Sequence, residues 1–428
     1  MKNKKETLLI LTILITICII IFNRDKLYEA KYTEPKDTLL AITINGEIST
    51  TFPTTKYYET SVECTTGTGK VEWNGTKWVL TTNGITKGST KCNATFITKV
   101  PTFAETILAN NKVKAPITTP GATISTASEA LLASTEDDYG TSYYFRGAVT
   151  NNYVEFANKC WRIVRVGGDG SVKLILHNDN PTGAANPCDA ANNSASAAFA
   201  HYNGSTYTSR FNENYDDNAY IGFKYGTPGS SKYETTHANT NKSTILTNLE
   251  TWYTNNLKTY ESVIDDTVWC NDKTNVTDTS YDPWSITPNG LGYAKNVTYY
   301  GATKRLVGTS GSAGGTGPSL KCNRELSKIN SKERLIKADE LAFAGYAYNI
   351  GNTTTYLQEN ATNTYWWSLS PYGFDVGSAG VWGVNGSAGY FDNYNVRGTY
   401  GVRPLISLKS TTNVTGEGTS SAPYIISM

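Results

Sequence analysis

Three groups of neighbouring carboxylates are the residues best suited to acid and base chemistry. Two carboxyl groups about 5 to 10 Å apart across a cleft can hydrolyse a glycosidic bond. The sequence does not supply that distance, and most adjacent acids serve turns or helix caps. A carbohydrate-active hydrolase therefore stays an alternative interpretation of this chain. The carboxylates concerned are Glu136, Asp137, Asp138, Asp216, Asp217, Asp265 and Asp266.

The sequence offers little that would hold a metal or a cofactor. Its three histidines, His177, His201 and His237, have no metal-ligand spacing. A calcium ion prefers oxygen ligands, and one acidic stretch could supply them, so calcium binding stays open. We expect no metal and no cofactor, and we favour a function without catalysis. The oxygen ligands considered are Asp265, Asp266, Asn271 and Asp272.

The stretch 375–400 has a composition typical of a binding surface. Tyrosine and tryptophan supply large contact area at low entropic cost, and glycine, serine and asparagine supply adaptable hydrogen bonds. Ordinary solvent-facing hairpins are the alternative, because turns favour asparagine for their own reasons. The predicted ligand-binding residues are Trp382, Asn385, Tyr390, Asp392, Tyr394 and Tyr400.

Strand-like segments flank this stretch and are expected to position it. Trp366 and Trp367 are adjacent, so on a strand they face opposite sides, and at least one should pack in a core. Arg403 lies in the apolar segment 401–408. A charge there is costly unless it is partnered, so we expect it to form an ion pair or to bind loop carbonyls. These three residues are predicted to be structural.

Six cysteines follow the N-terminal region and are expected to form disulfides. Their even number, without a Cys-x-x-Cys pattern or nearby histidines, favours disulfides over metal or redox chemistry. The predicted pairs are Cys64 with Cys92, Cys160 with Cys188 and Cys270 with Cys322. An unpaired buried thiol stays an alternative for Cys160, at the start of an apolar strand.

The N-terminus is interpreted as an uncleaved signal anchor. Lysines precede the apolar run 7–22, charged residues end it, and no small-x-small cleavage site follows. We expect a single-pass protein of the cell membrane, anchored through this helix, with most of the chain extracellular. The 38 basic and 37 acidic residues leave a net charge of +1, which gives no reason to expect nucleic acid as a partner.

The remaining pattern predicts four regions. Residues 1–37 are the anchor and a spacer, 38–100 a small disulfide-stapled β module, 101–140 a linker, and 141–428 an α+β domain. Asn-Gly pairs between apolar runs predict hairpins in the β module. In the last region, segments 160–176 predict a hairpin, while 243–260 and 337–344 predict helices.

Several motifs in the last region together resemble uncharacterised surface proteins of Gram-positive gut bacteria. The resemblance covers roughly residues 125–428. The motifs are Phe145-Arg146-Gly147, Asn152-Tyr153-Val154, Cys160-Trp161-Arg162-Ile163-Val164-Arg165, Gly168-Asp169-Gly170, Trp269-Cys270-Asn271-Asp272, Trp366-Trp367-Ser368-Leu369-Ser370-Pro371 and Gly401-Val402-Arg403-Pro404.

The segment 365–408 is also similar to domains of the C-type-lectin-like fold, as in formylglycine-generating enzymes and the variable proteins of diversity-generating retroelements. That resemblance implies a C-type-lectin-like domain. Two departures limit it. No cysteine follows Cys322, whereas formylglycine-generating enzymes use a cysteine pair near the terminus. The sugar-binding tripeptides of calcium-dependent lectins are also missing.

The sequence thus predicts an extracellular binding or adhesion protein that recognises a protein or a glycan through the stretch 375–400. A hydrolase using paired carboxylates and a purely structural envelope protein are the alternatives.

Overall fold

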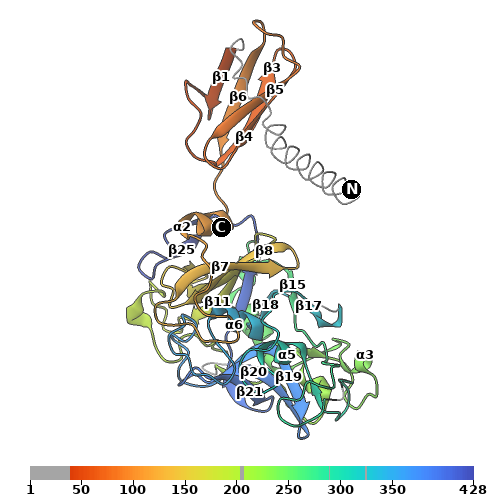
Figure 1. The fold of residues 1–428 in the computed structure, drawn as a ribbon. Coiled ribbons are helices and arrows are strands. Elements are labelled where there is room, and N and C mark those ends of the chain that lie inside the picture. Colours follow the sequence, from red (N-terminus) through yellow and green to blue (C-terminus); the bar gives the residue numbers. More distant parts are fainter. Residues whose placement is uncertain (1–38, 203–206, 289, 323–324) are drawn as a thin grey trace, which may run out of the picture. The chain divides into compact units, whose positions relative to one another are not determined.

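The computed structural model describes residues 39–202, 207–288, 290–322 and 325–428. The chain divides into a smaller unit that ends at Val100 and a larger unit that begins at Pro101 (Figure 1). The division falls where the predicted β module ends.

The smaller unit is built from antiparallel hairpins and one parallel strand pair. Asn45 and Gly46 both have positive φ, 51° and 89°, and turn the chain between the first two strands, as the Asn-Gly signal predicts. Apolar side chains of the strands, with Phe96 fully buried, form its core. The described strands are β1 (Leu39–Ile44), β2 (Glu47–Ser49), β3 (Tyr58–Cys64), β4 (Thr68–Trp73), β5 (Trp78–Asn83) and β6 (Lys91–Thr98).

The centre of the larger unit is a sheet of nine described strands. β10 and β11 form the predicted hairpin and are buried along their length. Strands from the C-terminal end of the chain extend this sheet on both sides: β23 lies beside β11, and β25 beside β9. The strands are β7 (Ala130–Asp137), β8 (Gly140–Gly147), β9 (Tyr153–Phe156), β10 (Lys159–Val166), β11 (Val172–Asn178), β18 (Glu333–Arg334), β23 (Leu405–Leu408), β24 (Val414–Thr415) and β25 (Tyr424–Ile426).

A second sheet, of six described strands, carries the predicted binding stretch. The long hairpin β19–β20 is its centre, and β21 pairs with β20 on the other side (Figure 1). The strands are β12 (Thr208–Arg210), β16 (Thr298–Tyr299), β19 (Trp366–Asp375), β20 (Ser378–Val384), β21 (Phe391–Asn395) and β22 (Thr399–Gly401).

Helices and short strand pairs accompany these sheets. The two predicted helices are present as α4 (Thr244–Asn256) and α6 (Ala338–Ala344). Ser243 caps α4 by accepting a hydrogen bond from the Leu246 amide. The other described helices are α2 (Phe103–Asn110), α3 (Tyr233–Thr236), α5 (Gly301–Leu306) and the 3-10 helices η1 (Ala190–Asn192), η2 (Asn218–Ile221), η3 (Lys258–Tyr260) and η4 (Glu325–Ser327); the paired short strands are β13 (Lys224–Tyr225) with β14 (Asn241–Lys242) and β15 (Thr267–Cys270) with β17 (Lys328–Ser331).

The predicted α+β class is wrong. The structure is mostly β: 36% of it is strand, arranged in many sheets, and 13% is helix. Long segments rich in glycine, asparagine and threonine, which look like loops in the sequence, contain short strands. These strands pair with partners far away in the chain, as β16 does with β19. The C-type-lectin-like α+β arrangement is corrected accordingly.

Two further expectations about the N-terminal half need correction or fall outside the structure. Residues 101–140, predicted as a linker, contain α2 and β7 and belong to the larger unit. The predicted signal anchor at 7–22 lies outside the described residues. Within the described ranges, no helix has the length and apolar character needed to cross a membrane, so the predicted spanning helix has no support here.

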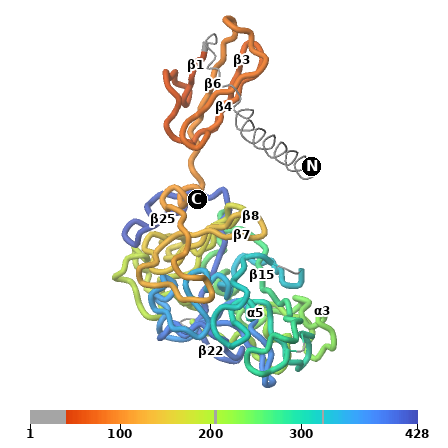
Figure 2. Tube along the Cα trace, viewed as in Figure 1, coloured from red at the N-terminus to blue at the C-terminus, as the bar shows by residue number. Residues whose placement is uncertain are grey.

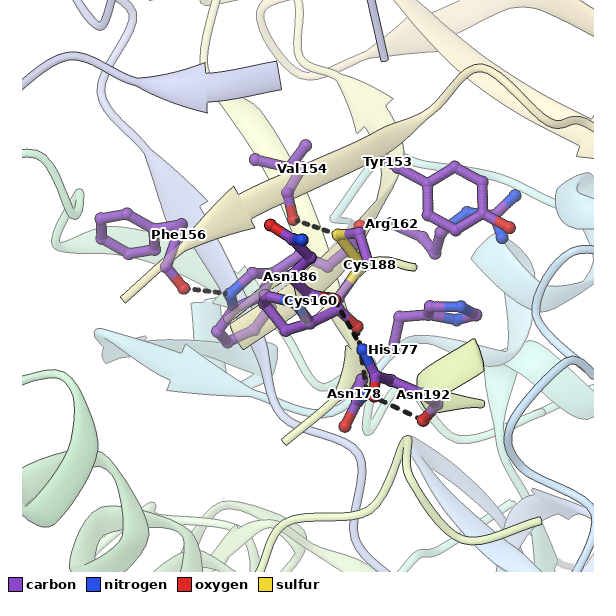
Figure 3. The surroundings of a disulfide bond; sticks show 12 residues. Tyr153, Val154, Phe156, Cys160, Arg162, His177, Asn178, Asn186, Cys188 and Asn192 are labelled. Carbon is purple, nitrogen blue, oxygen red and sulfur yellow. Dashed lines mark hydrogen bonds between the residues drawn. A yellow bond between two sulfur atoms is a disulfide. The ribbon is translucent and has the colours of Figure 1, made fainter. Parts of the chain in front are cut away.

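The three predicted disulfides are confirmed. Cys64–Cys92 joins opposite residues of β3 and β6, and Cys160–Cys188 and Cys270–Cys322 lie in the larger unit. Around Cys160–Cys188, the Asn178 amide donates to the carbonyls of Pro187 and Asn192, which fixes the loop that carries Cys188 (Figure 3). Such disulfides indicate an extracellular or secreted protein.

The two ends of the larger unit meet. Thr102 forms a β-bridge with Asn413, and the Phe103 ring contacts the Tyr424 ring of β25 at 5.2 Å between centroids. Figure 2 shows the start of this unit beside the C-terminal segment.

Candidate binding surface

The stretch 375–400 folds into β20, β21, β22 and their turns, and this fold separates its aromatic residues. Residues directly opposite on paired strands share one face of a sheet. Trp382 is opposite Asn393, whereas Gly383 is opposite both Trp367 and Asp392. Trp382 and Tyr394 therefore point to different faces.

Trp382 belongs to the core. Its side chain is 0% exposed, and its ring packs against Tyr348, Tyr372 and Phe391 at centroid distances of 5.7, 5.2 and 4.6 Å. The sequence pattern predicts it as a ligand-binding residue, but the structure leaves it no surface with which to contact a ligand.

Asn385 and Tyr390 lie at the turn between β20 and β21. The side-chain oxygen of Asn385 accepts hydrogen bonds from the Ser387 amide at 3.0 Å and the Ala388 amide at 3.2 Å, so this side chain holds the turn. Tyr390 is 44% exposed and forms a β-bridge with Gly351.

Asp392 is half-buried on the face that also carries Tyr394. Its carboxylate accepts from the Asn393 amide at 2.7 Å. Burial raises the pKa of Asp392.

Tyr394 and Tyr400 come together with Tyr365, and these three residues form what we call the tyrosine patch. The ring centroid of Tyr365 lies 5.0 Å from that of Tyr394 and 5.1 Å from that of Tyr400, and the centroids of Tyr394 and Tyr400 are 5.6 Å apart. Tyr365 is 38% exposed, and the other two are half-buried. The patch thus offers aromatic surface that is both held in place and accessible to solvent.

The buried Trp367 packs against Tyr400 of the patch. Its ring lies 4.7 Å from that of Tyr400, is fully buried, and contacts Phe211 as well. The indole Nε1 donates to the Ser209 carbonyl at 2.8 Å. Because Trp367 is anchored in this way, Tyr400 packs on a fixed surface.

Polar groups border the patch. Asn363, two residues before Tyr365, is exposed and donates to the Tyr207 hydroxyl at 2.6 Å. Asn395 is exposed, but as the residue after Tyr394 on β21 it points to the opposite face, where its amide donates to the Ser378 hydroxyl. Burial raises the pKa of Tyr394 and of Tyr400 above the ordinary value, so both hydroxyls stay neutral near pH 7 and can donate or accept hydrogen bonds.

Trp366 and Arg403, predicted to be structural, are fully buried. The Arg403 guanidinium is buried and donates to the carbonyls of Leu357 at 2.5 Å and Leu176 at 3.1 Å. It also lies 4.7 Å from the centre of the Trp366 ring. Arg403 therefore ties the segment before β23 to two neighbouring segments through carbonyl hydrogen bonds.

Two of the carboxylates considered for hydrolysis have clear structural partners. Asp137 pairs with Arg165 at 2.9 Å, and Asp217 caps η2 by accepting from the Ala219 amide at 2.9 Å. Asp272, considered for calcium, pairs with Arg305 at 2.5 Å. In the part of the chain that the structure describes, no group of three or more acidic, histidine or cysteine side chains is arranged to hold a metal ion.

The histidines also have structural surroundings. His237 is buried with Nε2 2.7 Å from the Gly292 carbonyl, and burial lowers its pKa to about 3. His177 is buried, and burial lowers its pKa well below the ordinary value. His201 contacts the Asp179 carboxylate at 3.2 Å.

Sequence reasoning misses Tyr365 as a surface residue, because the pattern groups it with Trp366 and Trp367 in a strand-like frame. A signal is nevertheless present. Residues two apart on an extended chain share a face, and Tyr365 precedes Trp367 by two. Its partners on β21 and β22 cannot be assigned without the register of the sheet.

Comparison of the chain with protein-family models, with curated proteins and with solved structures found no match.

Proposed function

We propose that this protein is an extracellular binding protein that recognises a glycan or another protein through the tyrosine patch. The observation that carries the proposal is the contact of Tyr365, Tyr394 and Tyr400 over the anchored Trp367. These three tyrosines come from three separate segments, and packing orders them before a ligand arrives. Preordered aromatic rings lose little entropy on binding.

The surroundings of the patch favour recognition. Tyrosine rings offer apolar faces to the C–H groups of a sugar or to apolar side chains, and exposed amides offer hydrogen bonds. Asn363, two residues before Tyr365, is exposed, and its amide donates to the Tyr207 hydroxyl at 2.6 Å. Asp392 lies on the same face as Tyr394, and a hydrolase of the usual kind needs two carboxylates across a cleft.

The test is binding of the full chain to a glycan array and to a panel of extracellular proteins. Alanine replacement of Tyr365, Tyr394 and Tyr400, singly and together, should weaken binding to whichever ligand is found. A central aromatic residue typically contributes about 2 kcal/mol or more, which corresponds to about 30-fold in Kd.

Tyr390→Ala is the matched control. Tyr390 is about as exposed as Tyr365, but it has no contact with the patch among the ring pairs of the described residues. It should leave affinity unchanged. Equal losses from Tyr390→Ala and Tyr394→Ala would contradict the proposed surface, and turnover of a bound glycan would favour the hydrolase. A wild-type chain that binds nothing would support a structural envelope protein.

A further inference from the structure

A second site lies in the larger unit and shares no lining residue with the tyrosine patch. It is a pocket of about 290 Å³ bordered by β10, β11, β15 and β18 and by the Cys270–Cys322 disulfide. We call it the lysine pocket. The residues that matter for its chemistry are Arg165, Lys173, Trp269, Leu320, Arg334 and Lys337.

Four of the lining side chains are buried cations, and two buried carboxylates neutralise only part of their charge. Glu340 accepts from Arg334 Nη2 at 2.6 and 2.7 Å and from Arg165 Nε at 3.0 Å. Asp137 accepts from Arg165 Nη1 at 2.9 Å. Burial opposes ionisation of Glu340, yet Arg334 and Arg165 hold its pKa well below the ordinary value. Both carboxylates therefore pair with arginines, and among the ion pairs of the described residues neither contacts Lys173 or Lys337.

Lys173 is the least compensated of these cations. It is 4% exposed, and its ammonium donates to the hydroxyls of Ser407 at 3.0 Å and Ser171 at 3.3 Å. Among the ion pairs of the described residues, none involves Lys173. Burial, followed by the nearby Arg165, lowers the pKa of Lys173 to about 7, and the charges of Asp169 and Glu340 offset only part of that shift.

Trp269 brings Lys173 and Arg334 together. The Lys173 ammonium lies 4.5 Å and the Arg334 guanidinium 4.4 Å from the centre of its ring. Arg334 Nε is buried and has no hydrogen-bond partner among the described atoms. An N–H without a hydrogen-bond partner and an ammonium without a direct carboxylate contact therefore adjoin the same indole, and both residues line the pocket.

Lys337 adds positive charge at the start of α6. Its ammonium lies 3.5 Å from the Ser319 carbonyl. The neighbouring Asp339 is bound by Arg305 at 2.6 Å. Burial lowers the pKa of Lys337, and the negative charge of Asp339 offsets part of that effect. Among the ion pairs of the described residues, none joins the Lys337 ammonium to a carboxylate.

We propose that the lysine pocket binds the carboxylate of a small organic monoanion, with Lys173 and Arg334 as its main donors. The carboxylate supplies the acceptor that Arg334 Nε lacks and a third acceptor for the Lys173 ammonium, which already donates to Ser407 and Ser171. Leu320 and the edge of Trp269 offer apolar surface to the remainder of the ligand. A volume of about 290 Å³ suits a ligand the size of a monosaccharide or an amino acid.

Charges of both signs line the pocket. Asp138 and Asp169 are exposed and line the same pocket, together with the buried Asp137. The exposed Lys328 lines it as well, so acidic and basic side chains both border the pocket.

Isothermal titration of the full chain with sodium D-glucuronate, N-acetyl-L-alanine and D-glucose tests the proposal. One of the two carboxylates should bind, and glucose, which lacks the charge, should not. Binding of glucuronate would identify a sugar acid as the source of the carboxylate, and binding of N-acetyl-L-alanine would identify an amino acid or peptide end. Binding of glucose as tight as glucuronate, or binding of neither carboxylate at millimolar concentration, would overturn the proposal.

Lys173→Met separates a binding role from a structural one. Replacing a buried uncompensated charge by an apolar side chain is often neutral or stabilising, so the thermal midpoint of the variant should stay the same or rise. Its affinity for the carboxylate should fall about 30-fold or more. Lys273→Met is the control, because Lys273 is also buried but its ammonium already has three acceptors, on Lys224, His237 and Asn239. Unchanged carboxylate binding by Lys173→Met would contradict the assignment.

Discussion

The Tyr394 ring lies directly over Gly383 of the neighbouring strand: a Cβ at position 383 would come within 2.9 Å of Tyr394 Cδ2. Gly383 is opposite Trp367 on one side and Asp392 on the other. The missing side chain at position 383 gives the Tyr394 ring room to lie across β20 toward Tyr365.

Gly383→Ala should displace Tyr394 and weaken ligand binding. The added methyl group would meet both the ring and the Trp366 carbonyl oxygen, the latter at 2.8 Å. Overpacking of this kind costs about 1 to 3 kcal/mol, so the free energy of unfolding should fall by a similar amount. Denaturant unfolding and binding measurements on the same preparation check both effects.

Gly380→Ala is the control for that change. Gly380 lies in the same strand, but the atoms nearest to a Cβ at this position would be 3.5 Å or more away, which is ordinary contact distance. This variant should retain binding. If Gly380→Ala and Gly383→Ala behaved alike, the position of the Tyr394 ring over Gly383 would not control the patch.

Trp382→Ala should destabilise the larger unit, because it removes a core side chain that has no surface with which to contact a ligand. Removing a fully buried tryptophan that packs on Tyr372 and Phe391 should cost about 3 to 5 kcal/mol. Urea unfolding measures this loss. A variant that keeps its stability but loses binding would return Trp382 to the ligand-binding residues.

Replacing Cys64 and Cys92 together by serine should destabilise the smaller unit. The disulfide closes a loop with a sequence separation of 28 residues. The entropy of closing such a loop corresponds to roughly 3 to 4 kcal/mol of stability. Calorimetry should show a lower midpoint for the transition of the smaller unit, and an unchanged thermogram would mean that the strand pairing of β3 with β6 suffices.

The stability of the larger unit should depend on pH through Glu333. Burial, followed by the nearby Glu250, raises its pKa to about 7 from an ordinary value near 4.5. The folded state therefore binds more protons than the unfolded state between these two values, and this carboxyl lowers stability as the pH rises from 4.5 to 7.

Glu333→Gln removes that penalty. The variant should match the wild type near pH 4.5 and exceed it above pH 7, by at most about 3 kcal/mol. Unfolding measured from about pH 4.5 to about pH 8 gives the difference at each pH. An advantage that grew as the pH fell would have the wrong sign for a raised pKa.

Local features of the fold were predictable from the sequence. The Asn45-Gly46 turn, helices α4 and α6 and the β10–β11 hairpin depend on turn chemistry and on periodicity over a few residues. The disulfides were predictable as well, because in each pair the cysteines are nearest neighbours in sequence.

Features that depend on sheet register were not predictable. Trp382 and Tyr394 are both aromatic residues in a polar context, and only the pairing of β20 with β21 assigns one to the core and the other to the surface. The lysine pocket is a stronger case. Ser407, which binds Lys173, is separated from it by 234 residues, and Trp269 and Arg334 come from two further strands. No local pattern brings these residues together.

The place of β23 in the nine-stranded sheet sets an order of events during synthesis. β11 is made early, yet its neighbour in the sheet, β23, follows much later: Ser407 of β23 lies 234 positions after Lys173 of β11. The second neighbour of β9, beside β10, is β25, near the end of the chain. Until those last strands emerge, β9 and β11 each present an open edge of unpaired amides and carbonyls. The nascent chain therefore has to keep these edges from pairing with other chains, and we expect the larger unit to close slowly, and only once nearly all of it is available.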